Sequence, residues 1–359
     1  MKHRQVGLNK VGVINTDGHA IGLDIGATSV RAAVLAPGIL DGRPSVTVHG
    51  IGHIDLPVGT VVGGIVIDAP ALTAALKRLW QEHKFECRNV ILGIANQQVI
   101  VRDMETPNLS EAQRAKALPF QAREIIALPI DQVVLDFAVL GTPAPGDALV
   151  QGLLLAAPRK PILAAVRAVE RAGLSVARVD LSAFAALRSI ADEMLAVEAV
   201  IDIGAQLTTI VIHNEGVPKL VRTLCRGGQE LTNELADRLD MTLVEAEAAK
   251  LAIGLDGDGT EITKVLNDAL RPLLAEIRTS IGYYRSNNDA AIARISLTGG
   301  GAALSGLAEV LSKQTGLPTR IVDPMQHVRN RLASVYTRSG VTDFGASAVA
   351  VGLAMGAAA

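Results

Sequence analysis

Two acidic residues set in glycine turns are the groups of this chain best suited to hold a metal-bound phosphate. In Val200–Ile212, β-branched and aliphatic residues flank a bend formed by Asp202, Gly204, Ala205 and Gln206. We expect two strands joined by a tight turn, because glycine allows the reversal. Backbone amides at such a turn can approach a phosphate, and an aspartate beside them can bind Mg²⁺. Taken alone, such a segment is more often an ordinary hairpin with a solvated aspartate.

The same pattern occurs a second time near the start of the chain. Within Gly22–Leu35, the run Asp24-Ile25-Gly26-Ala27 repeats Asp202-Ile203-Gly204-Ala205 residue for residue. The offset, 202 − 24 = 178 residues, is about the length of one domain. We therefore expect two similar lobes, whose acidic hairpins face each other across a cleft and hold one polyphosphate from both sides.

Two further glycine clusters could contribute to such a cleft. Gly227 and Gly228 precede an expected helix, whose first-turn amides would be free to bind an anion. The strand residues 295–298 run into Gly299, Gly300 and Gly301, where flat backbone could contact a purine or its α-phosphate. Plain tight turns would explain both clusters equally well.

The elements expected to position these groups are mixed strands and helices. Ser110 and Gln113 form a plausible capping box that opens a helix through Ile126. This helix belongs to a small β-α-β-β module, residues 88–157, which also contains strands at 98–103, 133–140 and 149–157. Other strands are expected at 45–56, 90–95, 175–181, 219–224 and 318–322, and other helices from residue 70, over 161–172, 182–190 and 262–284, near 304–315 and over 344–356.

This order predicts an α/β protein of two lobes. The first lobe would span residues 1–198 and contain the module 88–157 as an insertion. The second would span 199–340, with a helical subdomain at about 229–290. Residues 341–359 would form a C-terminal helix that returns to the first lobe.

Composition excludes several classes of protein. The 359 residues are 49% hydrophobic and 19% charged, and 34 basic and 36 acidic residues are well mixed, so we expect no nucleic-acid surface. The first residues lack the apolar core of a signal peptide, and no apolar tract is long enough to insert into a membrane. Cys87 and Cys225 have no metal-binding or redox spacing, and His49 and His53 lie in a strand-like context that suggests no metal site. We expect a cytoplasmic protein.

The order of acidic hairpin, acidic hairpin and strand followed by three glycines resembles the superfamily of actin, sugar kinases and chaperone ATPases. Within it, the chain is most similar to the family of the type IV pilus assembly protein PilM, which is related to the cell-division protein FtsA. The resemblance covers nearly the whole chain, and its most specific part lies in the inserted module. Its motifs are Gly22–Ala32, Leu118–Phe137, Ile201–Thr209, Glu276–Ser286 and Leu297–Leu307.

The resemblance implies a two-lobed actin-like ATPase fold with ATP and Mg²⁺ bound in the cleft. It assigns Asp24, Gly26, Thr28 and Ser29 to a first phosphate loop and Asp202, Gly204, Gln206 and Thr208 to a second, with Asp24 and Asp202 holding the metal. Gly227 and Gly228 would lie beside the nucleotide, and Gly299, Gly300 and Gly301 would contact adenosine. Glu247 and Lys250 would reach the ribose or adenine, although a helical Glu/Lys pair is most often a solvated face. Asp180 would orient a water and, with Asp202, form the catalytic pair.

One departure weakens the expectation of fast hydrolysis. Many members of the superfamily have an aspartate after the paired threonines of the second loop, where this chain continues Thr208-Thr209-Ile210. Phosphoryl transfer depends on positioned charge and an oriented water. We therefore expect at most slow ATPase activity.

The resemblance implies a scaffold of the pilus assembly machinery. It would lie at the cytoplasmic face of the inner membrane, hold the cytoplasmic tail of a PilN-like membrane protein between the inserted module and the first lobe, and link that protein to motor components. Self-association stays open. The alternatives are a small-molecule kinase, for which no substrate loop is found, and an FtsA-like filament, whose basic membrane helix has no counterpart after Arg338.

Overall fold

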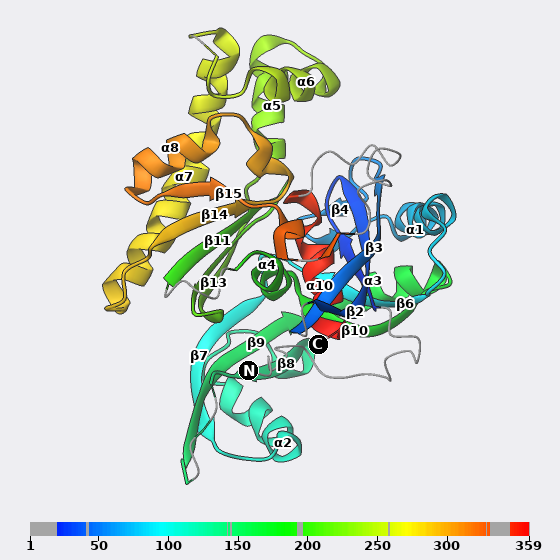
Figure 1. Cartoon of the computed structure of the whole chain (residues 1–359), viewed down its shortest axis with the longest axis vertical. Helices are drawn as coiled ribbons and strands as arrows, with labels where there is room; N and C mark the ends of the chain where they lie inside the picture. The colour runs from blue at the N-terminus through cyan, green and yellow to red at the C-terminus, as the bar shows by residue number, and fades with distance from the viewer. Residues whose placement is uncertain are drawn as a thin grey trace.

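The structure, a computed structural model, describes residues 20–40, 43–141, 143, 146–191, 197–257, 259–327, 329–330 and 345–358. The first residues of the chain, which are expected to lack a signal peptide, lie outside the described part. Two mixed sheets form the centres of two lobes, and a third, smaller sheet lies at one end of the molecule (Figure 1). The α/β class expected from the sequence is therefore confirmed.

The first lobe is built on a six-stranded sheet in the order β10-β6-β1-β2-β3-β16. Three antiparallel strands follow one another along the chain, and the other three add in parallel at the two sides. A small hairpin, β4 and β5, follows β3. The bounds are β1 Ala20–Ile25, β2 Ser29–Leu40, β3 Arg43–Asp55, β4 Val61–Val62, β5 Ile65–Val66, β6 Asn89–Ile94, β10 Ser175–Leu181 and β16 Arg329–Asn330.

Helices cover both faces of this sheet. On one face, α1 (Ala69–His83) and α3 (Arg159–Arg171) bury the leucines that the helical spacing predicted, Leu72, Leu76 and Leu79. On the other face lie α4 (Ser182–Ile190) and α10 (Ala348–Ala358). The small residues of α10 allow close packing, since a Cβ on Gly352 would lie 1.8 Å from the carbonyl oxygen of Ala185 in α4.

The second lobe repeats the topology of the first. Its sheet has the order β13-β12-β11-β14-β15, in which an antiparallel hairpin is again joined in parallel by a later strand. Helix α7 packs its apolar face against the sheet and continues through Pro272. The bounds are β11 Val197–Ile203, β12 Thr208–Asn214, β13 Val217–Leu224, α5 Gly228–Leu239, α6 Leu243–Ile253, α7 Glu261–Asn287, β14 Arg294–Thr298, α8 Leu307–Thr315 and β15 Thr319–Ile321.

The third sheet, β7-β9-β8, together with α2 makes the inserted module. The capping box of Ser110 and Gln113 is present and opens α2, which ends at Ala122 rather than at Ile126. The module strands are β7 Ile100–Pro107, β8 Val133–Val139 and β9 Leu149–Pro158, and α2 spans Glu111–Ala122.

One expectation about the module's start is wrong. The strand expected at 90–95, inside the module's expected bounds 88–157, is β6 and lies between β1 and β10 in the sheet of the first lobe. The strand expected at 98–103 is β7, which pairs with β9 in the module's own sheet. The two strands differ in burial, since β6 is buried from its second residue onward, whereas β7 mixes buried and exposed residues.

Short 3-10 turns complete the fold. They are η1 Ile130–Gln132, η2 Gly300–Ala303, η3 Pro324–His327 and η4 Gly345–Ser347. The helix expected near 304–315 is α8, which begins at Leu307, and η2 lies before it. Within the described residues, no helix is both long and apolar enough to cross a membrane.

Candidate functional site

A cleft between the lobes gathers most of the residues expected to bind a nucleotide. It is lined by both acidic hairpins, the glycine run after β14, and the start of α10. Among the residues predicted for the site, those that line the cleft are Asp24, Gly26, Thr28, Asp202, Gly204, Gln206, Gly299 and Gly300.

The two hairpins form matching turns. In the first, the Gly26 amide donates to the Ser29 carbonyl oxygen at 2.9 Å. In the second, the Gly204 amide donates to the Leu207 carbonyl oxygen at 2.8 Å. The sequence repeat is therefore also a structural repeat, with both aspartates two residues before the hydrogen-bonded glycine.

The carboxyl groups of Asp24 and Asp202 face the same cleft and interact electrostatically. Burial raises the pKa of Asp24 to about 6, and the positive charge of Arg31 opposes this rise. Burial raises the pKa of Asp202 to about 7; the negative charge of Asp24 raises it further, and Arg31 again opposes the rise. The raised pKa values mean that the negatively charged forms of both side chains are disfavoured in the cleft. A divalent cation, which binds oxygen ligands, would stabilise these charged forms.

Arg31 is a residue of the cleft that the sequence analysis missed. It lies on β2 directly opposite Asp24 and lines the cleft. Counting outward from the hairpin turn would have found it, since the antiparallel register fixes which residue faces Asp24. A guanidinium at this position can form bidentate hydrogen bonds to a phosphate.

The glycine run after β14 packs closely against the second hairpin. Gly299 has φ +86°, and a Cβ there would lie 2.3 Å from Asp202 Oδ1 and 2.5 Å from the Ile203 carbonyl oxygen. A Cβ on Gly301 would lie 2.5 Å from Ile203 Cγ2. These glycines therefore let the loop press onto the backbone that carries Asp202.

Beyond Gly300 and Gly301 lies a second, mainly apolar hollow. The buried Lys250 lines it and donates to the Gly228 carbonyl oxygen at 3.1 Å, to Thr232 Oγ1 at 2.9 Å and to Glu247 Oε2 at 2.6 Å. The amine is thus fixed between α5 and α6, while the carboxylate of Glu247 is half-exposed. Apolar side chains complete the lining: Ile203, Leu231, Leu251, Leu270, Leu273, Leu304 and Leu307. A flat apolar ring would suit these walls.

The first two amides of α5 are not free, contrary to expectation. The Gly228 amide donates to the Gly204 carbonyl oxygen at 2.9 Å, and the Gln229 amide donates to that of Ala205 at 2.8 Å. Gly227 is needed for this approach, because a Cβ there would lie 2.4 Å from the Gly204 carbonyl oxygen. This turn supports the second phosphate loop instead of offering an anion site of its own.

The hydroxyl groups of the two loops differ in their contacts. Thr208, expected to touch the nucleotide, is buried and donates from Oγ1 to the Arg226 carbonyl oxygen at 2.9 Å. Ser29 is also buried, and within the described part of the chain its Oγ has no hydrogen-bond partner. One hydroxyl therefore supports the backbone, and the other is buried without a hydrogen-bond partner among the described residues.

Asp180 was expected to orient a water at the nucleotide, but it does not line the cleft. Its side chain is fully buried, accepts from the Leu181 amide at 2.8 Å and forms an ion pair with Arg188. Arg188 Nε in turn donates to the Gly352 carbonyl oxygen of α10 at 3.0 Å. Ser182, two residues later, lines the cleft instead. Asp180 thus helps to hold α10, because its side chain leaves β10 on the side of that helix.

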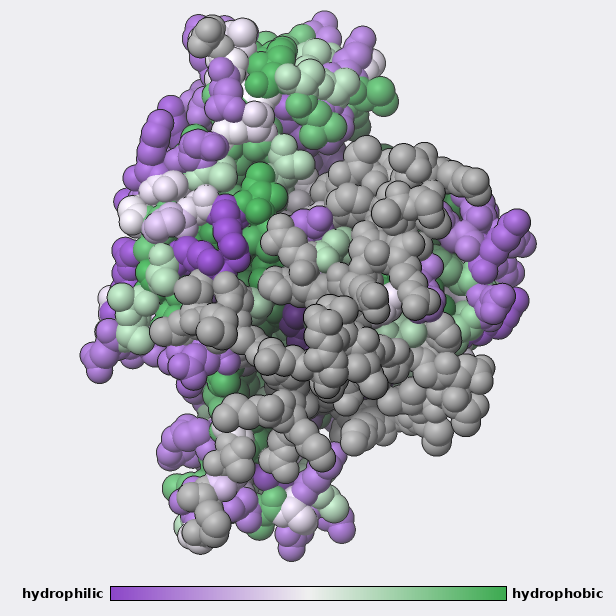
Figure 2. Space-filling view, viewed as in Figure 1, coloured by the Kyte–Doolittle hydropathy of each residue, from purple (hydrophilic) through white to green (hydrophobic). Residues whose placement is uncertain are grey.

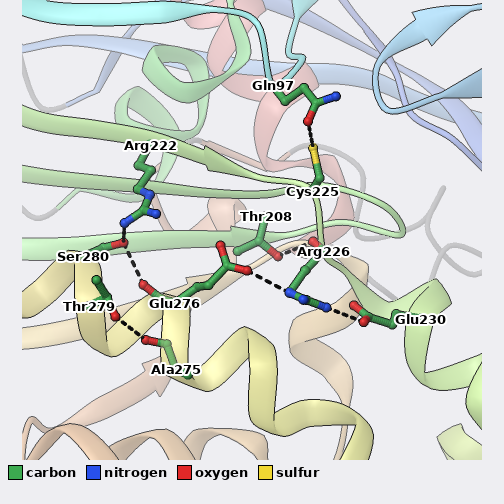
Figure 3. Close-up of polar contacts among 10 residues, drawn as sticks. All are labelled: Gln97, Thr208, Arg222, Cys225, Arg226, Glu230, Ala275, Glu276, Thr279 and Ser280. Carbon is green, nitrogen blue, oxygen red and sulfur yellow. Dashed lines mark hydrogen bonds and ion pairs between the residues drawn. The ribbon is translucent and has the colours of Figure 1, made fainter.

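Gln206 and Cys225 each form a side-chain hydrogen bond between the lobes beside the cleft. Gln206 Oε1 accepts from the amide of Gly63, in the turn between β4 and β5, at 2.9 Å. The Cys225 thiol donates to Gln97 Oε1 at 2.9 Å, as Figure 3 shows. Neither contact could be found from the sequence, because the partners are 143 and 128 residues apart.

A family model and a solved structure indicate the same family. The model of the family described as "Type IV pilus assembly protein PilM" matches residues 22–358. A chain of the solved "PilM-PilN type IV pilus biogenesis complex" is 28% identical with a TM-score of 0.82, over 95% of this chain and 98% of that chain. MreB5 of Spiroplasma citri bound to ADP is 15% identical with a TM-score of 0.52, over 94% of this chain and 95% of that chain. The two-lobed actin-like fold is therefore confirmed.

Curated relatives include the cell division protein FtsA. That of Pseudomonas aeruginosa is 26% identical over 378 residues, which cover 90% of this chain and 84% of that protein. That of Bacillus subtilis is 23% identical over 259 residues, which cover 65% of this chain and 58% of that protein. The match therefore spans less than two thirds of the Bacillus subtilis protein.

Proposed function

Because the chain belongs to the family of the type IV pilus assembly protein PilM, we propose that it is an ATP-binding scaffold of the pilus assembly machinery. It holds the cytoplasmic tail of a PilN-like inner-membrane protein and links that protein to motor components. It lies in the cytoplasm and reaches the inner membrane through this partner. The similarity to a chain of the PilM-PilN complex over nearly its whole length is the observation that carries the proposal.

The nucleotide site of this proposal is the cleft between the hairpins. Asp24 and Asp202 hold Mg²⁺, which neutralises charge on the phosphates and on the two carboxylates. Gly26, Thr28, Ser29, Gly204 and Arg31 surround the phosphates. Gly299, Gly300 and Gly301 and the hollow beside Lys250 receive adenosine, and Glu247 faces the ribose.

Hydrolysis is slow in this proposal. Asp180, the acid expected to orient water, is tied up with Arg188 inside the first lobe. No carboxylate follows Thr209 in the second loop. ATP then serves to hold the two lobes in a defined arrangement, while its turnover contributes little.

The surface of the chain suits a scaffold with two ends. The inserted module exposes large apolar side chains at Phe120, Ile125 and Leu149. At the opposite end of the molecule, α6 exposes Leu243, Val244 and Leu251, and Figure 2 shows this apolar surface at the top. Exposed apolar patches of this kind mark protein interaction sites. The module binds the PilN-like tail, and the helical end is available to another component.

An FtsA-like filament is the second candidate, favoured by the FtsA relatives. The scaffold is favoured over it, because the PilM family model and the solved PilM-PilN complex both match nearly the whole chain.

Calorimetric titration of a synthetic peptide, with the cytoplasmic tail sequence of the PilN homologue from the same genome, tests the proposal. Binding in the micromolar range, about −8 kcal/mol, is expected. Phe120→Ala, which removes a 69% exposed ring from the module, should weaken it at least fivefold. Tyr283→Ala, which removes a 63% exposed ring from α7, is the matched control and should leave it unchanged. Failure of the wild-type chain to bind the peptide would overturn the scaffold.

A parallel titration with Mg-ATP tests the nucleotide site. The wild-type chain should bind in the micromolar range, and Asp202→Ala should weaken binding more than tenfold, since a metal ligand is lost. Phosphate release should stay slow in both. Fast turnover by the wild-type chain would contradict the proposed role of ATP.

A further inference from the structure

The segment Cys225–Gln229, which runs from the end of β13 into the first turn of α5, touches three separate parts of the molecule. Its backbone contacts the second phosphate loop, one side chain reaches α7, and another reaches the first lobe (Figure 3). The proposed function uses none of these contacts. They identify the segment as a junction, and we use this name for it below.

The junction is fixed to the second phosphate loop by three hydrogen bonds. The amides of Gly228 and Gln229 donate to carbonyl oxygens of the loop at 2.9 Å and 2.8 Å, and Thr208 Oγ1 donates back to the Arg226 carbonyl oxygen at 2.9 Å. Gly227 is buried against the loop. A movement of the loop must therefore carry the junction with it, because any slip would break several hydrogen bonds at once.

The Arg226 side chain joins the junction to two helices. Its Nε donates to Glu276 Oε1 of α7 at 2.8 Å, and its Nη1 pairs with Glu230 of α5 (Figure 3). Glu276 opens one of the motifs by which the sequence resembles the PilM family, and no role was assigned to it from the sequence. This clamp makes the junction part of the rigid second lobe.

The Cys225 thiol carries the junction's contact to the first lobe. It donates to Gln97, which lies in the turn between β6 and β7. This turn is stiffened from within, since Asn96 Oδ1 accepts from the Gln98 amide at 2.9 Å and the Asn96 carbonyl oxygen accepts from the Val99 amide at 3.1 Å. A displacement at Gln97 therefore passes to β7, the first strand of the inserted module.

A second contact between the lobes leads to the same turn. Gln206 of the phosphate loop accepts from the Gly63 amide. The next residue, Gly64, lies against Ala95, since a Cβ there would be 1.7 Å from the Ala95 carbonyl oxygen. The phosphate loop is thus linked to the turn 95–98 by two routes, one through the β4–β5 hairpin to Ala95 and one through the junction to Gln97.

Apolar side chains of the module also pack against the sheet of the second lobe. Val101 of β7 and Leu153 and Leu155 of β9 share one apolar cluster with Val200 and Val211 of the second lobe's sheet. Movement of one sheet relative to the other must repack this cluster, because protein interiors are close-packed.

We infer that the Cys225–Gln97 hydrogen bond couples the nucleotide cleft to the inserted module, so that the module's affinity for its peptide partner depends on whether the cleft holds a nucleotide. This inference rests on the proposed function for the identity of the two ligands. Coupling is reciprocal: the factor by which nucleotide changes peptide affinity equals the factor by which peptide changes nucleotide affinity. Gln97 and Cys225 are positioning residues, and neither needs to touch a ligand.

The test measures peptide affinity in the full chain with and without saturating Mg-ATP, using the PilN-homologue tail peptide as the probe. We expect the two affinities to differ about fivefold, the lower end of common allosteric coupling. Gln97→Ala and Cys225→Ala should each lower this ratio at least twofold, and the double variant should add nothing; the contact through Gly63 remains in every variant. Each variant should keep its affinity for either ligand alone within about twofold. Gln81→Ala, an exposed glutamine of α1, and Cys87→Ala are the matched controls and should keep the wild-type ratio.

A second readout follows the contact itself. In a Cys87→Ser background, maleimide labelling of Cys225 should change in rate by at least twofold when Mg-ATP is added, because the thiol's contact with Gln97 changes. Peptide binding that is independent of nucleotide would overturn the inference and leave the scaffold intact. A ratio of peptide affinities that stays at the wild-type value in both single variants would also overturn the inference and leave the scaffold intact. Absence of peptide binding under all conditions would overturn the scaffold, and this inference with it.

Discussion

The two acidic hairpins share a four-residue sequence and a turn, yet their surroundings differ. The loop of the second hairpin is held by the junction before α5 and by Gly299, which presses against Asp202. The loop of the first hairpin exposes Thr28 and leaves the Ser29 hydroxyl without a partner among the described residues. Identical local sequence therefore gives identical turns, whereas the rigidity of each loop comes from segments far away in the chain.

This difference suggests a division of work within one site. A held loop presents its aspartate in a fixed position, and an open loop can adjust to the ligand.

Gly299→Ala should damage the second hairpin most. The new Cβ would collide with Asp202 Oδ1 and the Ile203 carbonyl oxygen, and φ is +86°. Overpacking and backbone strain together should lower the free energy of unfolding by about 3 kcal/mol. Denaturant unfolding measures this loss. Gly59→Ala is the matched control, since Gly59 has φ +83° with nothing within 4 Å of the added Cβ, and it should lose only about 1 kcal/mol. Equal losses would show that Gly299 is not confined by the second hairpin.

Asp202→Asn should stabilise the metal-free and nucleotide-free protein at pH 8. The pKa of Asp202 is raised to about 7 in the fold. Its charged form is therefore destabilising, and this penalty is full above pH 7, fades as pH falls towards 4, and is absent below the unfolded value. We expect a gain of about 2 kcal/mol at pH 8 after allowing for solvent screening.

Unfolding experiments at pH 8 and pH 5 check this sign. The gain should shrink at pH 5, and Asp24→Asn should give a smaller gain at pH 8, because the pKa of Asp24 is raised only to about 6. A gain that does not depend on pH would rule out charge at Asp202 as its cause.

Thr208→Val should cost about 1 kcal/mol of stability. The variant keeps the shape of the side chain but loses the hydrogen bond to the Arg226 carbonyl oxygen. Since this bond fixes the loop to the junction, Mg-ATP affinity should also fall about threefold. An unchanged free energy of unfolding, measured with denaturant, would mean that the second loop is not held there.

Ser29→Ala should have the smallest effect on stability, within about 0.5 kcal/mol. The hydroxyl has no partner to lose among the described residues. If the first loop keeps this group for the ligand, Mg-ATP affinity should fall about fivefold, the value of roughly one hydrogen bond. Calorimetry separates the two quantities, and a stability loss larger than that of Thr208→Val would reverse the comparison.

Much of the fold could be predicted from the sequence, because its signals are local. The turn glycines and alternating apolar residues correctly predicted both hairpins. The helical spacing of Leu72, Leu76 and Leu79 correctly predicted α1. The capping box of Ser110 placed the start of α2. The end of α2 and the sheet to which β6 belongs were wrong, since neither has a local signal that separates the alternatives.

The candidate site was predicted in part for the same reason. The repeated aspartates and glycines have a recognisable spacing, and the structure brings them to one cleft. Asp180 is an acidic residue as a catalytic acid requires, but its carboxylate forms an ion pair with Arg188, which in turn donates to α10, and it does not line the cleft. Arg31 was missed although the register of the hairpin contains the information.

The sequence by itself determined the turns, the duplicated lobes and the family, because each depends on residue types at short or repeated spacings. Only the tertiary structure decided which polar groups remain available. It showed that the first two amides of α5 are already hydrogen-bonded to the phosphate loop and that the Cys225 thiol donates to Gln97 of the other lobe. Hydrogen bonds between distant segments leave no trace in local spacing, since they depend on how complete sheets and helices pack together.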